Sequence, residues 1–153
     1  MLFRMEKKKM SPGEPYSIVL ADDHALFREG LRKMLAERGL KVIGEAADGF
    51  ELLNFLRMSR SIPDMAIVDI TMPNLGGIEA TRQIKATHPG VKVLILTMHK
   101  AKEYIDEAFS AGAEGYLLKE DIGTDLFSAI ETIRQGKVYV SSLSTKNSTE
   151  ETK

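Results

Sequence analysis

The sequence predicts an α/β fold in which helices cover both faces of a parallel sheet. Two observations lead to this prediction: five short apolar runs recur along the chain, and each is followed by a segment with the helical spacing of apolar residues. Strict alternation of strands and helices is typical of a parallel sheet. Right-handed crossovers then place the carboxyl ends of all five strands on one edge.

The first apolar run spans residues 18–21 and ends in the pair Asp22 and Asp23. A helix with one apolar face follows and ends near Gly39, a common C-cap residue. Its apolar face consists of Phe27, Leu31, Met34 and Leu35. The second strand, residues 41–44, leads into a second helix marked by Phe50, Leu53 and Leu56.

The third strand, residues 65–68, runs directly into Asp69, which opens a turn. The next helix carries Ile78, Thr81 and Ile84 on one face. The fourth strand, residues 91–96, ends at Thr97, and the fifth, residues 115–118, ends at Lys119. The last two helices have apolar faces formed by Ile105, Ala108 and Phe109, and by Leu126, Ala129, Ile130 and Ile133.

We therefore expect a doubly wound (βα)5 sheet with the flavodoxin-like strand order 2-1-3-4-5, in which the first and third strands are neighbours. This order places Asp22 and Asp23 beside Asp69, with Thr97 and Lys119 on the same edge. Taken singly, the acids have simpler explanations as turn residues or helix N-caps. Ligands of such sheets bind beyond the carboxyl ends of the strands, so the convergence of all five side chains favours a site.

Three clustered carboxylates repel one another unless a cation lies among them. An oxygen-only site favours Mg²⁺ over softer metals. Lys119 adds an ammonium and Thr97 adds a hydroxyl donor, and these groups suit a transferring phosphoryl group. Asp69 is then the candidate nucleophile, which would form an aspartyl phosphate.

Composition excludes several other classes. The 153 residues suffice for one domain, and the net charge of −1 gives no electrostatic argument for binding nucleic acid or an anionic membrane. The absence of Cys excludes disulfides and thiolate metal sites. No apolar stretch is long enough for a membrane span or a secretory signal, so we expect a cytoplasmic protein without a membrane partner.

Over about residues 17–140 the chain resembles the receiver domain of bacterial response regulators in two-component signalling. The matching pieces are Ala-Asp-Asp-His at 21–24, Val-Asp-Ile-Thr-Met-Pro at 68–73, Leu-Thr at 96–97 and Gly-Tyr-Leu-Leu-Lys at 115–119. Together with residues 27–31, they resemble the LuxR-type (NarL/FixJ-like) subclass, whose members have a helix-turn-helix output domain.

The resemblance implies that Asp69 accepts a phosphoryl group from a sensor histidine kinase. It implies that Asp23, Asp69 and the backbone carbonyl of Thr71 ligate Mg²⁺. Asp22 would support the ion through water, and Lys119 would pair with a phosphoryl oxygen. The protein would be a phosphoacceptor that assists its own phosphorylation and dephosphorylation rather than an enzyme.

The resemblance also implies a switch, in which Thr97 moves toward the phosphoryl group and Tyr116 turns inward. A dimerisation or output surface would change as a result, with a homodimer as one partner state and DNA contacted only through the output domain. Tyr116 has a simpler explanation as a packing residue in an edge strand. His24 and His99 are expected as turn or helix-start residues rather than ligands.

Two positions depart from the common receiver pattern. Glu120 follows Lys119 where many receivers have proline, which removes an X-Pro bond and predicts a more mobile loop. Met98 follows Thr97 where a small residue is usual, and its bulk is expected to restrict access to the site or to obstruct the threonine shift.

Two other functions remain open at this point. A phosphohydrolase of the haloacid dehalogenase type also uses a strand-end Asp and Mg²⁺, but it would need a second Asp where this chain has Thr71. The other is a receiver-like interaction module that is never phosphorylated.

The expected organisation has three parts: a disordered N-terminal tail at residues 1–16, the receiver domain at 17–140, and a linker or tail at 141–153. The last segment is rich in Ser, Thr, Lys and Glu and cannot build a core, so we expect no output domain here. The chain is either a receiver-only protein or one cut in the interdomain linker, and the subclass favours the second.

Overall fold

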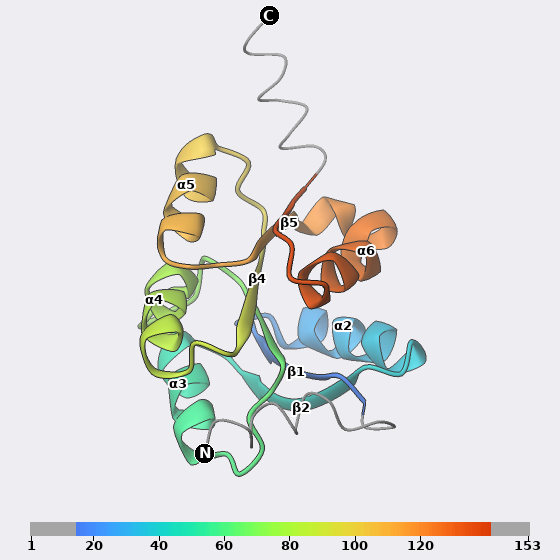
Figure 1. The fold of residues 1–153 in the computed structure, drawn as a ribbon, viewed down its shortest axis with the longest axis vertical. Coiled ribbons are helices and arrows are strands. Elements are labelled where there is room, and N and C mark those ends of the chain that lie inside the picture. The colour runs from blue at the N-terminus through green and yellow to red at the C-terminus, as the bar shows by residue number, and fades with distance from the viewer. Residues whose placement is uncertain (1–14, 142–153) are drawn as a thin grey trace, which may run out of the picture.

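The computed structural model describes residues 15–141, and Figure 1 shows the order of their elements. The expectations for residues 1–14 and 142–153 lie outside the described residues. The strands are β1 (Ser17–Ala21), β2 (Lys41–Ala46), β3 (Met65–Val68), β4 (Lys92–Thr97), β5 (Gly115–Leu118) and β6 (Tyr139–Val140). The helices are α2 (Ala25–Glu37), α3 (Gly49–Met58), α4 (Gly77–Thr87), α5 (Lys102–Ser110), the 3-10 helix η1 (Lys119–Asp121) and α6 (Ile122–Arg134).

The strands form one parallel sheet in the order β2-β1-β3-β4-β5-β6. The predicted order of the first five strands is therefore confirmed. From the sequence, residues 137–140 are predicted only as a brief extended segment. Part of it forms a sixth strand that pairs with β5, next to the hydrogen bond from Ser141 N–H to Tyr116 O at 2.8 Å. Consequently β5 is an inner strand, and the placement of Tyr116 at the sheet edge was wrong.

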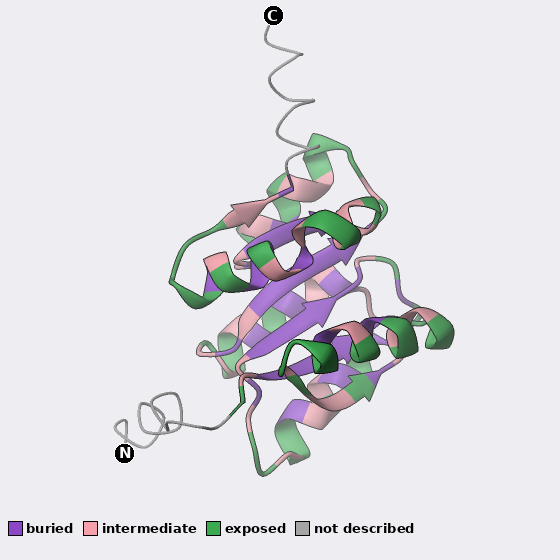
Figure 2. Ribbon diagram, turned by 90° about the vertical axis from the view of Figure 1, so that its right-hand side faces the viewer, coloured by how far each residue is buried: buried purple, intermediate pink, exposed green. Residues whose placement is uncertain are grey.

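Helices cover both faces of the sheet. In Figure 1, α3, α4 and α5 lie on one side of it, and α2 and α6 on the other. Figure 2 shows the strands as the buried layer between them. Side chains alternate along β1, so that Val19 and Ala21 pack toward α3 and α4 while Ile18 and Leu20 pack toward α2 and α6. The near-continuous apolar runs of the strands follow from this burial on both faces.

The apolar face predicted for α3 is partly wrong. Phe50 is 57% exposed, whereas Leu52 and Leu56 are fully buried. The helix begins at Gly49 because the side chain of Asp48 caps it, accepting a 2.8 Å hydrogen bond from Glu51 N–H. Leu52 and Leu56 pack in the core on the sheet side of the helix, and Phe50 lies outside that core. Within the described residues, no helix is both long and apolar enough to cross a membrane.

Candidate functional site

Two buried carboxylates lie side by side at the carboxyl edge of the sheet. Asp22 follows β1 and Asp69 follows β3, and these strands are adjacent. The backbone N–H of Asp69 donates to Ala21 O at 2.9 Å, which fixes the relative position of the two strand ends. Asp22 is 4% exposed and Asp69 is 5% exposed. The predicted pairing of these acids is thus present in the structure.

Lys119 bridges the two carboxylates. Its Nζ lies 2.8 Å from Asp22 Oδ2 and 3.3 Å from Asp69 Oδ2. The same ammonium lies 4.3 Å from the ring centroid of Phe27 on α2, which is a cation–π distance. Phe27 was predicted only as part of an apolar helix face. The ring holds the ammonium over the acids, and sequence spacing alone does not reveal that contact.

The pKa values of Asp22 and Asp69 shift in opposite directions. Burial alone would raise the pKa of Asp22, but its hydrogen bonds with Lys119 and His24 outweigh burial and hold that pKa below its usual value. Burial raises the pKa of Asp69, and the charge of Asp22 adds to this, although Lys119 opposes it. The shorter contact of Lys119 with Asp22 accounts for the difference.

Burial alone would lower the pKa of Lys119. The hydrogen bond to Asp22 and the charge of Asp69 more than compensate, so the pKa is raised and the ammonium stays charged. At neutral pH the Lys119 ammonium therefore lies protonated between two buried acids.

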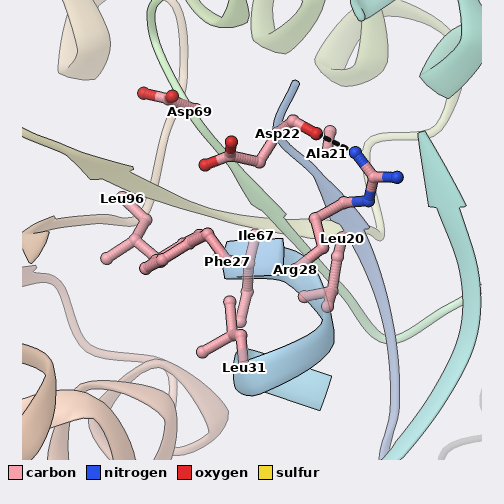
Figure 3. Close-up of a pocket in the computed structure, with 9 residues that line it drawn as sticks. All are labelled: Leu20, Ala21, Asp22, Phe27, Arg28, Leu31, Ile67, Asp69 and Leu96. Carbon is pink, nitrogen blue, oxygen red and sulfur yellow. Dashed lines mark hydrogen bonds between the residues drawn. The ribbon is translucent and has the colours of Figure 1, made fainter. Parts of the chain in front are cut away.

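The two buried acids lie against apolar side chains, and these exclude water from the carboxylates. Figure 3 shows Asp22 and Asp69 above side chains that line a small hollow between α2 and the sheet. The apolar lining consists of Leu20, Ala21, Phe27, Leu31, Ile67 and Leu96. Arg28 closes one side of the hollow, where its guanidinium donates a hydrogen bond to Asp22 O.

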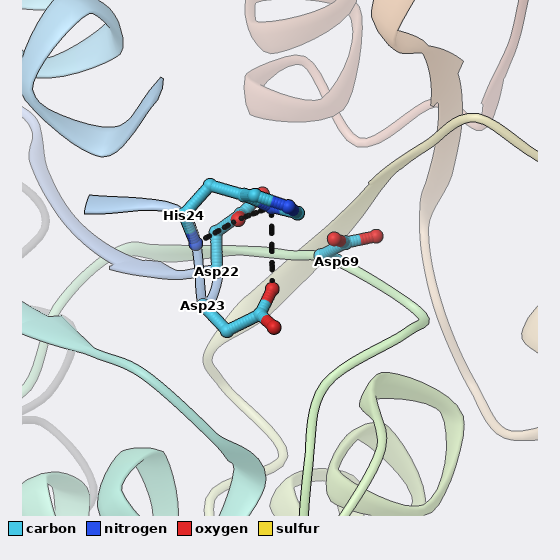
Figure 4. A group of neighbouring side chains, drawn as sticks. All are labelled: Asp22, Asp23, His24 and Asp69. Atoms are coloured by element: carbon cyan, nitrogen blue, oxygen red, sulfur yellow. Dashed lines mark hydrogen bonds and ion pairs between the residues drawn. The ribbon is translucent and has the colours of Figure 1, made fainter. Parts of the chain in front are cut away.

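Four side chains could hold a metal ion. One ligand atom from each of Asp22, Asp23, His24 and Asp69 lies within 4.8 Å of the others, and Figure 4 shows Asp22, Asp23 and His24 converging with Asp69 beside them. Three of the four donors are carboxylates, which suits a hard cation such as Mg²⁺. Asp23 is exposed to solvent at the edge of the acid cluster. An ion bound beside Asp23 could therefore keep several of its water ligands.

His24 lies closer to the acids than its sequence position suggested. It is the N-cap residue of α2, as expected for a helix-start residue. Its Nδ1 also lies 3.0 Å from Asp22 Oδ1 and 3.2 Å from Asp23 Oδ1. His24 therefore orders both carboxylates, a contact that the sequence argument missed.

The predicted switch residues meet at the loop after β4. Thr97 is fully buried, and its hydroxyl accepts a 3.2 Å hydrogen bond from His99 N–H. Tyr116 is also fully buried, and its hydroxyl donates to His99 O at 2.8 Å. Thr71 lies two residues after Asp69, and its N–H is directed at Asp69 Oδ1 at 3.4 Å.

The two atypical positions lie outside the acid cluster. The side chain of Met98 is largely in solvent, since the residue is 72% exposed. Glu120 lies in η1 and pairs with Lys100, whose Nζ is 3.2 Å from Glu120 Oε1. This ion pair connects the loop after β5 to the loop after β4.

A parallel α/β sheet with two buried acids and a bridging lysine at its carboxyl edge defines the class of protein: a doubly wound domain with a cation-neutralised acidic site. Comparison with known proteins identifies the family. Residues 18–149 match the response regulator receiver domain family. The chain is 39% identical over 124 residues to the transcriptional regulatory protein DegU of Brevibacillus brevis, covering 80% of this chain and 52% of that protein.

Solved structures agree with this result. A two-component response regulator of the LuxR family from Aurantimonas has a TM-score of 0.83 at 38% identity, covering 90% of this chain and 98% of that one. A structure of RcsB dimers bound to DNA has a TM-score of 0.75 at 28% identity, covering 83% of this chain and 64% of that one. The chain belongs to the response regulator receiver domain family, and its relatives are LuxR-family regulators.

This family is a regulatory one rather than a family of enzymes. The chain spans about half the length of the DegU protein that it matches.

Proposed function

We propose that this receiver accepts a phosphoryl group on Asp69 from a sensor histidine kinase and thereby switches a dimerisation or output surface. The observation that supports this most is the convergence of Asp22, Asp69 and Lys119 from the ends of three strands into one buried cluster. A buried acid with a fixed ammonium beside it is the arrangement that phosphoryl transfer to a carboxylate needs.

The chemistry follows from the positions of these groups. An Asp69 carboxylate oxygen attacks the phosphorus of a phosphohistidine, the P–N bond breaks with its electron pair going to the imidazole nitrogen, and that nitrogen takes a proton from solvent. Lys119 turns from Asp69 Oδ2, the more distant of its two partners, toward a phosphoryl oxygen. Asp22 retains the other side of the ammonium and keeps it in place.

The oxygen donors of the cluster would hold Mg²⁺. Asp23, Asp69 and the carbonyl of Thr71 would ligate the ion, and Asp22 would support it through water. When bound, Mg²⁺ supplies positive charge that offsets the charge of the carboxylates and of the phosphoryl oxygens. The rim position of Asp23 and the proximity of all three acids support this assignment.

The switch and the partners are part of the same proposal. Thr97 would move toward the new charge. Tyr116, expected to turn inward on switching, is already buried with its hydroxyl on His99 O, so it would keep this inward position and hold the loop after β4. The RcsB dimers bound to DNA support a homodimer and transcriptional control through a helix-turn-helix domain outside the receiver fold. The protein would act in the cytoplasm, where the kinase presents its phosphohistidine.

Phosphorylation of Asp69 can be measured directly by intact mass. Incubation with acetyl phosphate and Mg²⁺ should add one phosphoryl group to the protein. Asp69→Asn should abolish this addition. Asp106→Asn is the matched control, because Asp106 lies on the exposed face of α5 and pairs with Lys102 at 2.9 Å, and it should label like the wild type.

Two outcomes would overturn the proposal. Labelling that persists in Asp69→Asn would assign the acceptor elsewhere. Absence of labelling in the wild type, together with no response to Mg²⁺, would favour the interaction module that is never phosphorylated.

A further inference from the structure

One residue, His99, contacts four different parts of the region around the site. Its ring Nε2 lies 2.9 Å from Thr71 Oγ1, and the ring stacks on Tyr104 with centroids 4.1 Å apart and 19° between the planes. Its backbone carbonyl accepts from the Tyr116 hydroxyl at 2.8 Å, and its backbone N–H donates to Thr97 Oγ1 at 3.2 Å. Side chain and backbone thus hold different partners.

We propose that His99 is a positioning residue that connects the acceptor loop to Tyr116 through its side chain. The contact between the Thr71 hydroxyl and the His99 ring, which we call the ring clasp, is the central link. This inference rests on the proposed function for its signal, which would start at Asp69. The contacts themselves exist independently of that signal.

The acceptor side of the connection is short. Thr71 lies two residues after Asp69, and its N–H is directed at the Asp69 carboxylate at 3.4 Å. A displacement of that carboxylate therefore displaces Thr71. Through the ring clasp, the same displacement reaches the loop after β4, which belongs to another strand.

The switch side depends on the backbone of His99. Tyr116 is fully buried, so water is not a ready hydrogen-bond partner for its hydroxyl. The hydroxyl therefore depends on the His99 carbonyl as its acceptor. Stacking on Tyr104 at the start of α5 limits the positions of the ring, and hence of the carbonyl that follows it. The clasp therefore holds Tyr116 inward.

His99 provides a second connection between the region around Asp69 and Tyr116, beside the one expected through Thr97. The Thr97 path runs through a hydroxyl on β4 itself, whereas the His99 path crosses from the loop after β3 to the loop after β4. His99 was predicted as a turn or helix-start residue, because nothing in its spacing points to Thr71. Only the sheet order brings the two loops together.

The clasp predicts non-additive effects in the free full-length chain. Thr71→Val removes the hydroxyl at constant shape, and His99→Phe removes the ring nitrogen but keeps an aromatic ring for stacking. Each should raise hydrogen exchange at the amide of residue 99, taken relative to the intrinsic rate of the residue present there, by about threefold, which is within the range expected for one neutral hydrogen bond. The double variant should show no further increase, because both changes remove the same contact.

Three further measurements make the test specific. Thr71→Ser keeps the hydroxyl and should exchange like the wild type. Thr87→Val removes a similar exposed contact, from Thr87 Oγ1 to His88 Nδ1 at 2.9 Å, and should leave the His99 amide unchanged. With 3-fluorotyrosine incorporated, the ¹⁹F resonance of Tyr116, assigned by its loss in Tyr116→Phe, should shift toward the solvent position in Thr71→Val and in His99→Phe.

Additive exchange effects, or a Tyr116 resonance that does not respond to Thr71→Val, would overturn the inference. A beryllofluoride titration with Mg²⁺ separates this from the proposed function. If the wild type fails to bind beryllofluoride while the exchange coupling is present, the phosphoacceptor function is wrong and the clasp stands. If the wild type binds and the coupling is absent, the reverse holds.

Discussion

The unequal contacts of Lys119 predict opposite effects for its two acidic partners. Asp22→Asn removes the charge at 2.8 Å from Nζ and should lower the free energy of unfolding by about 2 kcal/mol, as expected for a charge-assisted hydrogen bond. Asp69→Asn removes a buried carboxylate whose pKa is already raised and should stabilise by on the order of 1 kcal/mol. Chemical denaturation at pH 7 without divalent ions measures both.

The same pair predicts a pH dependence with a definite sign. The pKa of Asp22 is lowered on folding, so its stabilisation is present above the unfolded value of about 4 and is lost as the pH falls through the folded pKa. The pKa of Asp69 is raised, so stability is lost as the pH rises through its folded pKa. Asp69→Asn should therefore converge on the wild type below about pH 4, whereas Asp22→Asn should converge only at lower pH, once the lowered folded pKa of Asp22 has been passed. Differences that persist unchanged into acid would contradict this assignment of charges.

For single residues, the sequence predicts the side chains that lie at the ends of strands. Asp22, Asp69 and Lys119 each follow an apolar run directly, so the fold class brings them together. Phe27 and His24 lie on the first turn of α2, where the direction of a side chain depends on how the helix rotates against the sheet. That rotation is a tertiary property, and no local pattern encodes it.

Among the elements, the start of α4 limits where the backbone of Asp69 can lie. A Cβ at Gly77 would lie 2.0 Å from Asp69 O, so any side chain there must displace the loop after β3 or the helix. Gly77→Ala should lower the free energy of unfolding by about 2 kcal/mol and slow labelling of Asp69 by about tenfold. Thermal unfolding and the acetyl phosphate assay measure the two effects.

Gly30 provides the matched control for this substitution. It lies within α2, and a Cβ there would meet nothing within 4 Å. Gly30→Ala should raise the free energy of unfolding by about 0.5–1 kcal/mol through helix propensity and should leave labelling unchanged. Equal effects of the two substitutions would show that α4 does not constrain the acceptor loop.

Elements whose pattern is long and periodic were predictable, and the exceptions have physical causes. The inner strands β1, β3, β4 and β5 are apolar runs because both of their faces are buried, whereas the edge strand β2 is only partly buried. β6 has only two residues, Tyr139 and Val140, too few for any period, and it is defined by its pairing with β5. Phe50 was assigned to the wrong face because α3 offers more apolar residues than its buried face uses, and tertiary packing selects Leu52 and Leu56.

For the whole molecule, the position of the acid cluster couples cation binding to global stability. The cluster joins the ends of β1, β3 and β5, and these strands separate the two apolar cores. A ligand that binds only the folded state adds its binding free energy to that of unfolding. Any cation held by the three acids should therefore raise the melting temperature of the entire domain.

We expect Mg²⁺ at a tenfold excess over its dissociation constant to add about 1.4 kcal/mol, which raises the melting temperature by about 4 °C. Asp23→Asn should lose most of this increase, because Asp23 supplies the exposed carboxylate of the cluster. Without Mg²⁺ the variant should melt close to the wild type, since the contacts of Asp23 are at the surface. Potassium chloride at equal ionic strength controls for screening, and Asp106→Asn controls for the loss of one negative charge. A full Mg²⁺ response in Asp23→Asn would remove Asp23 from the ligand set, whereas a response that potassium chloride reproduces would assign the whole effect to screening.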